Sequence, residues 1–245
     1  MLSARHILVC SAFGTAALCT IASASAQPTR QKQVITPKPF TAKDLPAPRH
    51  PILPGGYPKP YVSEGSNVGS AIPMPADYPV ASTAKWTYLV YIAGDNDLED
   101  YVVTDIETEL ALPGSSDDVQ VVAMADRTPG YSTAGGNWTG TLLFHVQPGQ
   151  TATPDAAIAD LGERNMGDSS SLEEFVSWSK EHFPAERYAL IFWDHGWTWL
   201  PGQSTIDETD GDALDLDEVT SALTATGPVD VVGFDECFMA SLEIQ

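Results

Sequence analysis

Apolar residues along the last two thirds of the chain alternate between strand-like runs and helix-like repeats. β-Branched and aromatic residues fill residues 86–93, and residues 119–125 form a second run of the same kind. Between the two runs, four apolar residues recur at intervals of four: Leu98, Val102, Ile106 and Leu110. This spacing places them on one face of a helix. A strand, a turn and a helix in this order are typical of the opening of a parallel α/β unit.

The alternation continues toward the C-terminus. Five further elements are predicted in order: a strand at 138–146, a helix at 172–183, a strand at 188–195, a helix at 216–226 and a strand at 229–234. This succession predicts a mostly parallel sheet with helices on both faces. Cys237 is expected to open one more helix, inside which the sequence stops at Gln245 without a cap, so we expect a fragment of a longer chain.

The first 26 residues have the pattern of a secretory signal peptide. Arg5 precedes an apolar stretch at residues 7–21, and residues 24–26 supply the small side chains of a cleavage site. A membrane anchor needs about 20 apolar residues, and this stretch is shorter and interrupted by polar side chains. No other segment is apolar enough to span a bilayer. We therefore expect an exported protein, secreted, periplasmic or at the cell surface, with no membrane span after signal removal.

Residues 27–85 differ from the rest of the chain in composition. Between residues 27 and 79 lie 12 of the 19 prolines, and little apolar periodicity accompanies them. Such a segment cannot bury a core, which predicts a spacer or a pro-segment. The domain expected to fold is residues 86–245.

Charge is distributed unevenly between these two parts. Residues 27–85 hold seven basic and three acidic residues, whereas only four basic residues oppose thirty acids from residue 86 onward. The net charge is −21, and it becomes −22 when Arg5 leaves with the signal peptide. Such a field repels nucleic acid and attracts cationic ligands, although solubility alone would also explain it.

Two polar residues at predicted strand ends are candidates for catalysis. Cys237 is the only cysteine outside residues 1–26, and His195 ends the strand before it. If the two strands are parallel neighbours, both side chains emerge at the same edge of the sheet. An adjacent histidine lowers a thiol pKa and makes the thiolate nucleophilic, whereas a lone thiol can equally be a buried small hydrophobe.

The neighbouring residues complete a site for acyl transfer. The N–H groups of Gly196 and Cys237 could stabilise an oxyanion. Asp194 precedes the histidine directly, and adjacent side chains of a strand point in opposite directions, so Asp194 is not included among the catalytic residues.

Four sequence blocks, in order, are similar to those of a known family. They are YIAGDNDL at 91–98, NMGD at 165–168, FWDHGW at 192–197 and GFDECFMA at 233–240. These blocks resemble the clostripain (C11) cysteine peptidases, and the resemblance runs from about residue 86 to residue 245. It implies a caspase/hemoglobinase-like α/β sandwich that is truncated here, with His195 and Cys237 as the catalytic dyad. It also implies protein or peptide substrates cleaved after arginine or lysine, with Asp235 lining the pocket for the basic side chain.

Acyl transfer by a cysteine and a histidine requires no cofactor, whereas the resemblance to the clostripain family implies calcium as a possible cofactor. Weak candidates for calcium ligands lie in an acidic loop: Asp207, Asp210 and Asp212. Their spacing departs from that of a calcium loop, because glycine falls at the fifth position and not the sixth. Asp215 and Glu218 fit a helix cap and its capping-box partner. Residues 95–97 are expected to cap the first helix.

Two classes of function remain open. One is an exported cysteine endopeptidase that cleaves after arginine or lysine through a thioester acyl-enzyme. The other is a truncated or non-catalytic exported domain that binds basic peptides through its acidic surface.

Overall fold

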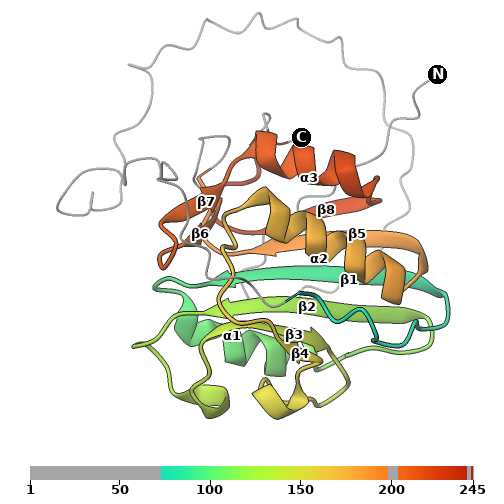
Figure 1. Cartoon of the computed structure of the whole chain (residues 1–245), viewed down its shortest axis with the longest axis horizontal. Helices are drawn as coiled ribbons and strands as arrows, with labels where there is room; N and C mark the ends of the chain where they lie inside the picture. Colours follow the sequence, from blue (N-terminus) through green and yellow to red (C-terminus); the bar gives the residue numbers. More distant parts are fainter. Residues whose placement is uncertain (1–72, 198–203, 242–243, 245) are drawn as a thin grey trace, which may run out of the picture. The chain divides into compact units, whose positions relative to one another are not determined.

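The computed structural model describes residues 73–197, 204–241 and 244, so the predicted signal peptide and most of the proline-rich segment lie outside the described residues. A six-stranded sheet with the order β4-β3-β2-β1-β5-β8 is the main feature (Figure 1). Its strands are β1 (Ala84–Gly94), β2 (Val119–Arg127), β3 (Gly140–His145), β4 (Ala159–Asp160), β5 (Ala185–Trp193) and β8 (Val231–Asp235). The strands β2, β1, β5 and β8 are mutually parallel, β3 pairs with β2 in antiparallel fashion, and β4 pairs with β3 in antiparallel fashion. The prediction of a mostly parallel sheet is confirmed.

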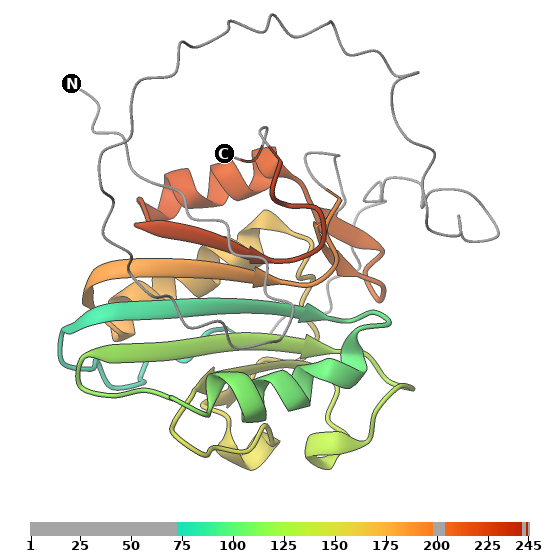
Figure 2. The same ribbon diagram turned by 180° about the vertical axis from the view of Figure 1, so that it is seen from behind.

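Helices cover both faces of this sheet, as predicted. Helices α2 (Ser169–His182) and α3 (Leu216–Thr226) lie on one face, and α1 (Glu99–Asp105) lies on the other (Figures 1 and 2). A π-helical segment (Ile106–Leu110) continues α1. Short 3-10 turns occupy Ala134–Gly136 and Pro154–Ala156. Within the described residues, no helix combines the length and apolarity needed to cross a membrane.

The two faces of β1 explain the unbroken apolar run at residues 88–93. Leu89 and Tyr91 pack into the core below α2, together with Phe175. Val90 and Ile92 point to the opposite face and join the core below α1. All five side chains are at most 5% exposed. Burial of a large apolar side chain contributes about 1.5–3 kcal/mol, and a strand buried on both faces needs apolar residues at every position.

Residues 73–83 pack against α2 although they belong to the segment predicted as a spacer. The indole N–H of Trp178 donates to the carbonyl of Pro75 (2.9 Å), and the N–H of Ala81 donates to the carbonyl of His182 (2.7 Å). The ring of Tyr78 lies 5.7 Å from that of Trp178. The end of the proline-rich segment therefore contributes to the folded unit.

The predicted helix at Cys237 is wrong for the described residues up to 241. Cys237 and Phe238 form a turn, and the residues described after it are not helical. Phe238 has a φ of +63°, in the left-handed region, and a right-handed helix cannot continue through such a residue. Cys237 therefore lies in a turn and not at the N-terminus of a helix.

Helix caps agree with the sequence in one helix and not in the other. Asp215 and Glu218 form the predicted capping box of α3. In α1 the N-cap position is Leu98, without a side-chain cap, and only Asn96 approaches that role by accepting the N–H of Leu98 (2.9 Å). Asp95 and Asp97, on either side of Asn96, make other contacts and do not cap this helix. A hairpin of β6 (Ser204–Asp207) and β7 (Asp212–Leu214), which the sequence did not predict, fills the acidic loop.

Candidate active site

The pairing of β5 with β8 brings His195 and Cys237 to one edge of the sheet. The strands are parallel neighbours, and Trp193 at the end of β5 is in register with Asp235 at the end of β8. Each candidate residue therefore follows a paired position by two residues, as expected from the sequence. Cys237 is a free, exposed thiol in the described part of the chain.

Contacts between the two segments hold this edge together. A methyl group placed at Gly196 would lie 2.7 Å from the carbonyl oxygen of Cys237 and 2.8 Å from Cβ of Glu236. Only glycine permits this approach. The rings of Trp197 and Phe238 stack with their centroids 5.4 Å apart. The residues after the histidine and the turn after the cysteine are thus packed against each other.

His195 has a carboxylate partner that sequence reasoning assigned to a helix cap. Its Nε2 lies 2.8 Å from Oδ1 of Asp97 in an ion pair whose carboxylate side chain is 69% exposed. A carboxylate accepts, so Nε2–H donates, and Nδ1 is the nitrogen left to exchange a proton with a nucleophile. The sequence signal for this partner was the acidic run Asp95-Asn96-Asp97. An acidic residue that follows a strand can have several roles, so its pairing with His195 could not be predicted.

Asp194 supports the backbone around His195 and does not act through the imidazole. Its buried carboxylate accepts hydrogen bonds from the side-chain amide of Asn96 (2.9 Å) and from the backbone N–H groups of His195 and Ile206. Burial is the largest cause that raises the pKa of Asp194 well above its ordinary value. These contacts join the end of β1, the end of β5 and the β6 strand.

Glu236, next to the thiol, is also held in a low-dielectric position. The hydroxyl of Ser204 donates to its carboxylate at 3.0 Å. Burial, followed by the charge of Asp194, raises the pKa of Glu236 well above its ordinary value. This direction shifts the equilibrium of Glu236 toward its neutral form, and the neutral form does not repel a neighbouring thiolate.

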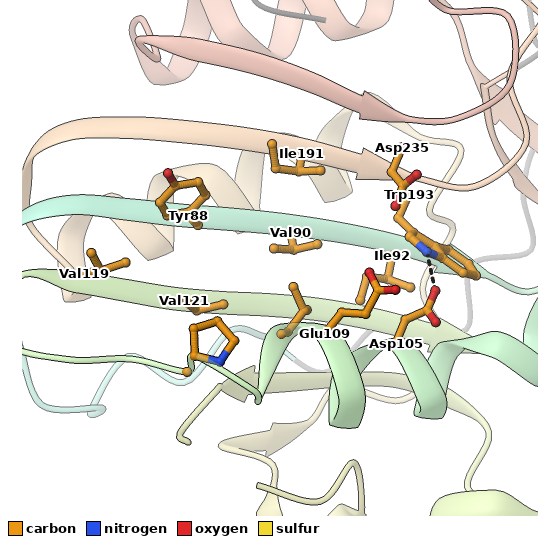
Figure 3. Close-up of a pocket in the computed structure, with 13 residues that line it drawn as sticks. Tyr88, Val90, Ile92, Asp105, Glu109, Val119, Val121, Ile191, Trp193 and Asp235 are labelled. Carbon is orange, nitrogen blue, oxygen red and sulfur yellow. Dashed lines mark hydrogen bonds between the residues drawn. The ribbon is translucent and has the colours of Figure 1, made fainter. Parts of the chain in front are cut away.

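Asp235 lies at the acidic end of an apolar groove on the α1 face of the sheet (Figure 3). The cavity has a volume of about 390 Å³, and Val90, Ile92 and Ile191 contribute to its wall. Asp105 and Glu109 lie at the same end, where Asp105 accepts the indole N–H of Trp193 (2.9 Å). Burial, and then the charge of Glu109, raises the pKa of Asp235. Such a groove suits an aliphatic chain that ends in a cation.

The three calcium candidates from the acidic loop do not stay together. Asp207 joins Asp95, Asp126 and Glu163, and carboxylate oxygens of these four residues lie within 4.8 Å of one another. Asp212 accepts hydrogen bonds from the side chain of Asn165 (2.8 Å) and from the N–H of Ala213 (3.0 Å). Asp210 is outside the group and donates its N–H to Asp207 (2.8 Å). The additional members come from distant parts of the sequence, which is why spacing could not find them.

A parallel α/β domain that presents a free thiol and a carboxylate-bound imidazole at adjacent strand ends defines the class of caspase-like cysteine peptidases. Comparison with known sequences gives the same answer, since the sequence model of the clostripain family (C11) matches residues 90–245. The chain belongs to that family.

Similar proteins show how much of a family member this chain represents. Clostripain of Hathewaya histolytica is 27% identical over an alignment of 186 residues, and the match covers 65% of this chain and 35% of clostripain. A secreted C11 cysteine protease from Bacteroides thetaiotaomicron, solved with an irreversible peptide inhibitor, is 25% identical with a TM-score of 0.53, covering 66% of this chain and 45% of that protein. A structure of the B. thetaiotaomicron protease called iotapain matches in fold, with a TM-score of 0.51 and 13% identity over 67% of this chain and 49% of that one. The chain therefore spans about a third of clostripain and less than half of the solved proteases.

Proposed function

We propose that this chain forms the N-terminal part of an exported cysteine endopeptidase that cleaves after arginine or lysine, with His195 and Cys237 as its catalytic dyad. The observation that carries the proposal is the parallel pairing of β5 with β8, which ends both strands at one edge of the sheet. Family membership over residues 90–245 supports it. The predicted signal peptide, and relatives described as secreted proteases, support export.

In the proposed reaction, the thiolate of Cys237 attacks the carbonyl carbon of the scissile bond. The N–H groups of Gly196 and Cys237 stabilise the resulting oxyanion, and His195 gives a proton to the departing amine. The C–N bond breaks and leaves a thioester on Cys237. Water, whose proton goes to His195, then attacks the thioester, and the carboxylic acid product leaves as the thiol is restored. These steps need no cofactor.

Specificity in this proposal comes from Asp235 and the groove below it. The side chain of arginine or lysine has an aliphatic stem that fits beside Val90, Ile92 and Ile191, and a cationic head that would meet carboxylates. The thirty acids from residue 86 onward would attract such substrates over a longer range.

The same groove favours a second candidate function, namely binding of basic peptides without cleavage. Asp105, Glu109 and Asp235 would recognise an arginine or lysine side chain whether or not Cys237 reacts. This alternative applies if the dyad cannot act without the remaining length of the family's fold.

Hydrolysis of matched fluorogenic peptides that end in arginine, lysine or glutamate tests the first proposal. We expect turnover of the arginyl or lysyl peptide only, and a loss of more than about a thousandfold in the Cys237→Ala variant. The assay should be run on this chain and on a longer chain with the family's full length. A folded long chain that cleaves none of the peptides, or that cleaves them equally after Cys237→Ala, would refute the peptidase.

Labelling separates the two candidates. An arginyl chloromethyl ketone should alkylate Cys237 in the peptidase, and Asp235→Asn should slow this labelling while leaving the reaction with iodoacetamide unchanged. Retained binding of an arginine-containing peptide to a protein that the ketone does not label would favour the binding domain.

A further inference from the structure

His195 lies between two other segments at the edge of the sheet. The strand order β1-β5-β8 places the end of β5, which His195 follows, between the ends of its two neighbours (Figure 1). Asp97 belongs to the loop after β1, and Cys237 belongs to the turn after β8. Neighbouring strands of a sheet lie about 4.8 Å apart. An imidazole at the end of the middle strand can therefore meet one side chain from each neighbour.

Asp97 contacts the imidazole from the β1 side. Oδ1 of Asp97 lies 2.8 Å from Nε2 of His195, and a carboxylate only accepts, so Nε2 carries the proton. The neutral ring then has its lone pair on Nδ1. Helix α1 does not use Asp97 as its cap, because its N-cap is Leu98, which makes no side-chain cap hydrogen bond. The contact with the ring is thus the interaction that the structure gives to this carboxylate.

A buried hydrogen bond joins the residues that precede Asp97 and His195. Asn96 is 1% exposed, and its side-chain amide donates to Oδ1 of Asp194 (2.9 Å). The carboxylate of Asp194 also accepts the backbone N–H of His195. Oδ1 of Asn96 accepts the N–H of Leu98 (2.9 Å), which fixes the turn that carries Asp97. The pairs 96–194 and 97–195 therefore form two consecutive links between the ends of β1 and β5.

Glu208 is a second carboxylate near the imidazole. Its backbone N–H donates to the carbonyl of Asp95 (2.9 Å), so it lies beside the same loop. Burial, followed by the charges of Asp97 and Asp95, raises the pKa of Glu208, whereas the charge of His195 lowers it. Glu208 therefore acts on His195 through its charge, while Asp97 acts through a directed hydrogen bond.

We propose that Asp97 is a positioning residue, which keeps the proton of His195 on Nε2 and Nδ1 free on the side of Cys237. A carboxylate that accepts from one nitrogen of an imidazole fixes the tautomer and the orientation of the ring. Nδ1 would then take the proton of the Cys237 thiol and pass it to the departing amine, while the proton on Nε2 stays in place. This consequence for the reaction rests on the proposed peptidase function, whereas the orientation of the ring does not.

Nitrogen-15 NMR of the histidine rings tests the orientation on this chain carrying Cys237→Ala, which removes the thiol proton. At about pH 9, above the ordinary imidazole pKa of about 6.5, the shifts report which nitrogen is protonated. We expect a protonated Nε2 and an unprotonated Nδ1 for His195, whose signals are assigned by their loss in His195→Gln. Asp97→Ala should move the two signals toward each other, as a mixture of tautomers does, and Glu208→Gln should leave them unchanged.

Two results of this experiment would overturn the proposal. One is a pair of His195 signals that is the same with and without Asp97, and the other is a parent protein with the proton on Nδ1. The side chain of Asp97 is 69% exposed, so we expect Asp97→Ala to keep the fold, which circular dichroism checks. None of these readouts needs peptidase activity.

Kinetics test the consequence on the chain that cleaves the arginyl or lysyl peptide. Asp97→Ala should lower kcat about ten- to a hundredfold and change KM by less than about twofold, because Asp97 acts on His195 and not on the substrate. Asp97→Glu should recover part of the loss, and Glu208→Gln should stay within about twofold of the parent. Cleavage that Asp97→Ala leaves unchanged, or that Glu208→Gln lowers equally, would refute the positioning role and leave the peptidase standing. If no chain cleaves the peptides, the peptidase fails and the NMR signals still decide the role of Asp97.

Discussion

Two buried charged clusters lie next to each other at the end of β2, and they are built in opposite ways. Arg127 and Asp126 are adjacent residues, both 0% exposed, and the alternation of a strand sends their side chains to opposite faces. Arg127 enters a cluster in which the strongest charges are paired within the protein. Asp126 enters a group of four carboxylates, with Asp95, Glu163 and Asp207, whose oxygens lie within 4.8 Å of one another.

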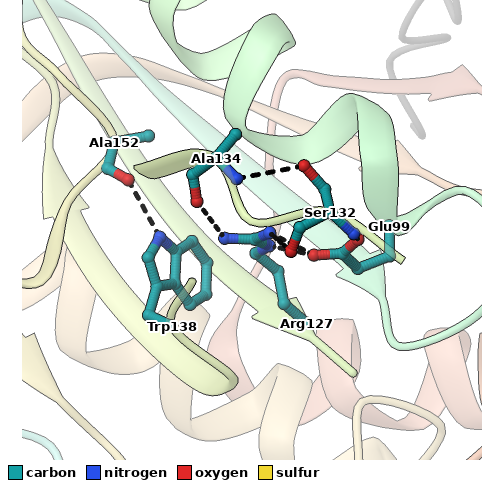
Figure 4. Close-up of polar contacts among 6 residues, drawn as sticks. All are labelled: Glu99, Arg127, Ser132, Ala134, Trp138 and Ala152. Carbon is teal, nitrogen blue, oxygen red and sulfur yellow. Dashed lines mark hydrogen bonds and ion pairs between the residues drawn. The ribbon is translucent and has the colours of Figure 1, made fainter. Parts of the chain in front are cut away.

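The cluster around Arg127 satisfies its charges internally (Figure 4). The guanidinium forms an ion pair and a hydrogen bond with Glu99 of α1, and it donates to the carbonyls of Ala134 (3.1 Å) and Ser132 (3.3 Å). The ring of Trp138 lies 4.6 Å from Cζ of Arg127. The difference between the clusters teaches that a buried carboxylate can be paired with a base, or can lie among other acids where burial and repulsion raise its pKa and favour the protonated form.

Breaking the internally paired cluster should have the largest effect. Arg127→Met leaves the carboxylate of Glu99 buried and unpaired, and we expect the free energy of unfolding to fall by about 3–5 kcal/mol in urea denaturation. Arg187→Met, at an exposed position over Trp86, should change it by less than about 1 kcal/mol. Adding Glu99→Gln to Arg127→Met should recover part of the loss. Equal losses in the free energy of unfolding for the two arginine variants would show that the buried ion pair contributes no more to stability than the exposed arginine does.

Removing a side-chain donor of Asp126 should have an intermediate effect. Thr141→Val deletes the hydroxyl that donates to Asp126 Oδ1, and loss of a hydrogen bond to a buried carboxyl group costs about 1–3 kcal/mol. We expect a decrease of this size in the free energy of unfolding, measured by urea denaturation. A variant as stable as the parent would contradict a stabilising role of this hydrogen bond.

The pH dependence of stability should differ between the clusters. Glu163 and Asp207 have folded pKa values of about 8 and about 7, above their unfolded values near 4, so the folded state binds more protons in this interval. Their contribution is fully present below about pH 4 and is lost as pH rises to 8. Because Glu163 is half-buried, we expect a loss of only about 1 kcal/mol, or about 2–4 °C in melting temperature between pH 5 and 8. Glu163→Gln should flatten this slope, and a slope that this variant does not reduce must come from other groups.

The smallest effect is expected from a change at Trp138, which belongs to the cluster around Arg127. Trp138→Phe removes the indole N–H that donates to the carbonyl of Ala152 (2.9 Å) and weakens the contact with Arg127. We expect destabilisation of about 1 kcal/mol. The pH dependence of the melting temperature should equal that of the parent, because Trp138 faces the paired cluster. A changed pH dependence would indicate that the two clusters are coupled through β2.

The sequence predicted the elements that local periodicity governs. The bounds of α3 are those expected from its apolar spacing and capping box, and the parallel neighbours β5 and β8 placed His195 and Cys237 at one edge. Periodicity could not show that the four-residue repeat after Leu98 passes from an α-helix into a π-helix at Ile106. It also predicted a helix at Cys237, where the left-handed φ of Phe238 and its stacking on Trp197 produce a turn.

The sequence could not predict which side chains meet across the fold, for a physical reason. Asp97 meets His195, and Asp95 meets Asp126, Glu163 and Asp207, only after the fold has brought together segments that are far apart in the sequence and belong to two different sheets. Within the sequence each of these acids looks like a cap or a loop residue. The roles of His195, Cys237, Gly196 and Asp235 in a reaction stay predictions that the proposed assays test.

Strand β8 carries a consequence for the behaviour of the chain in solution. It pairs with β5 along one side only, and no described strand pairs with its other side. The outer side of residues 231–235 therefore presents a row of backbone donors and acceptors that any extended segment can extend by β-augmentation. We expect the chain on its own to self-associate as its concentration rises, which size-exclusion chromatography over a dilution series would reveal. A covering strand, whether from the same polypeptide or from a partner, would abolish this association.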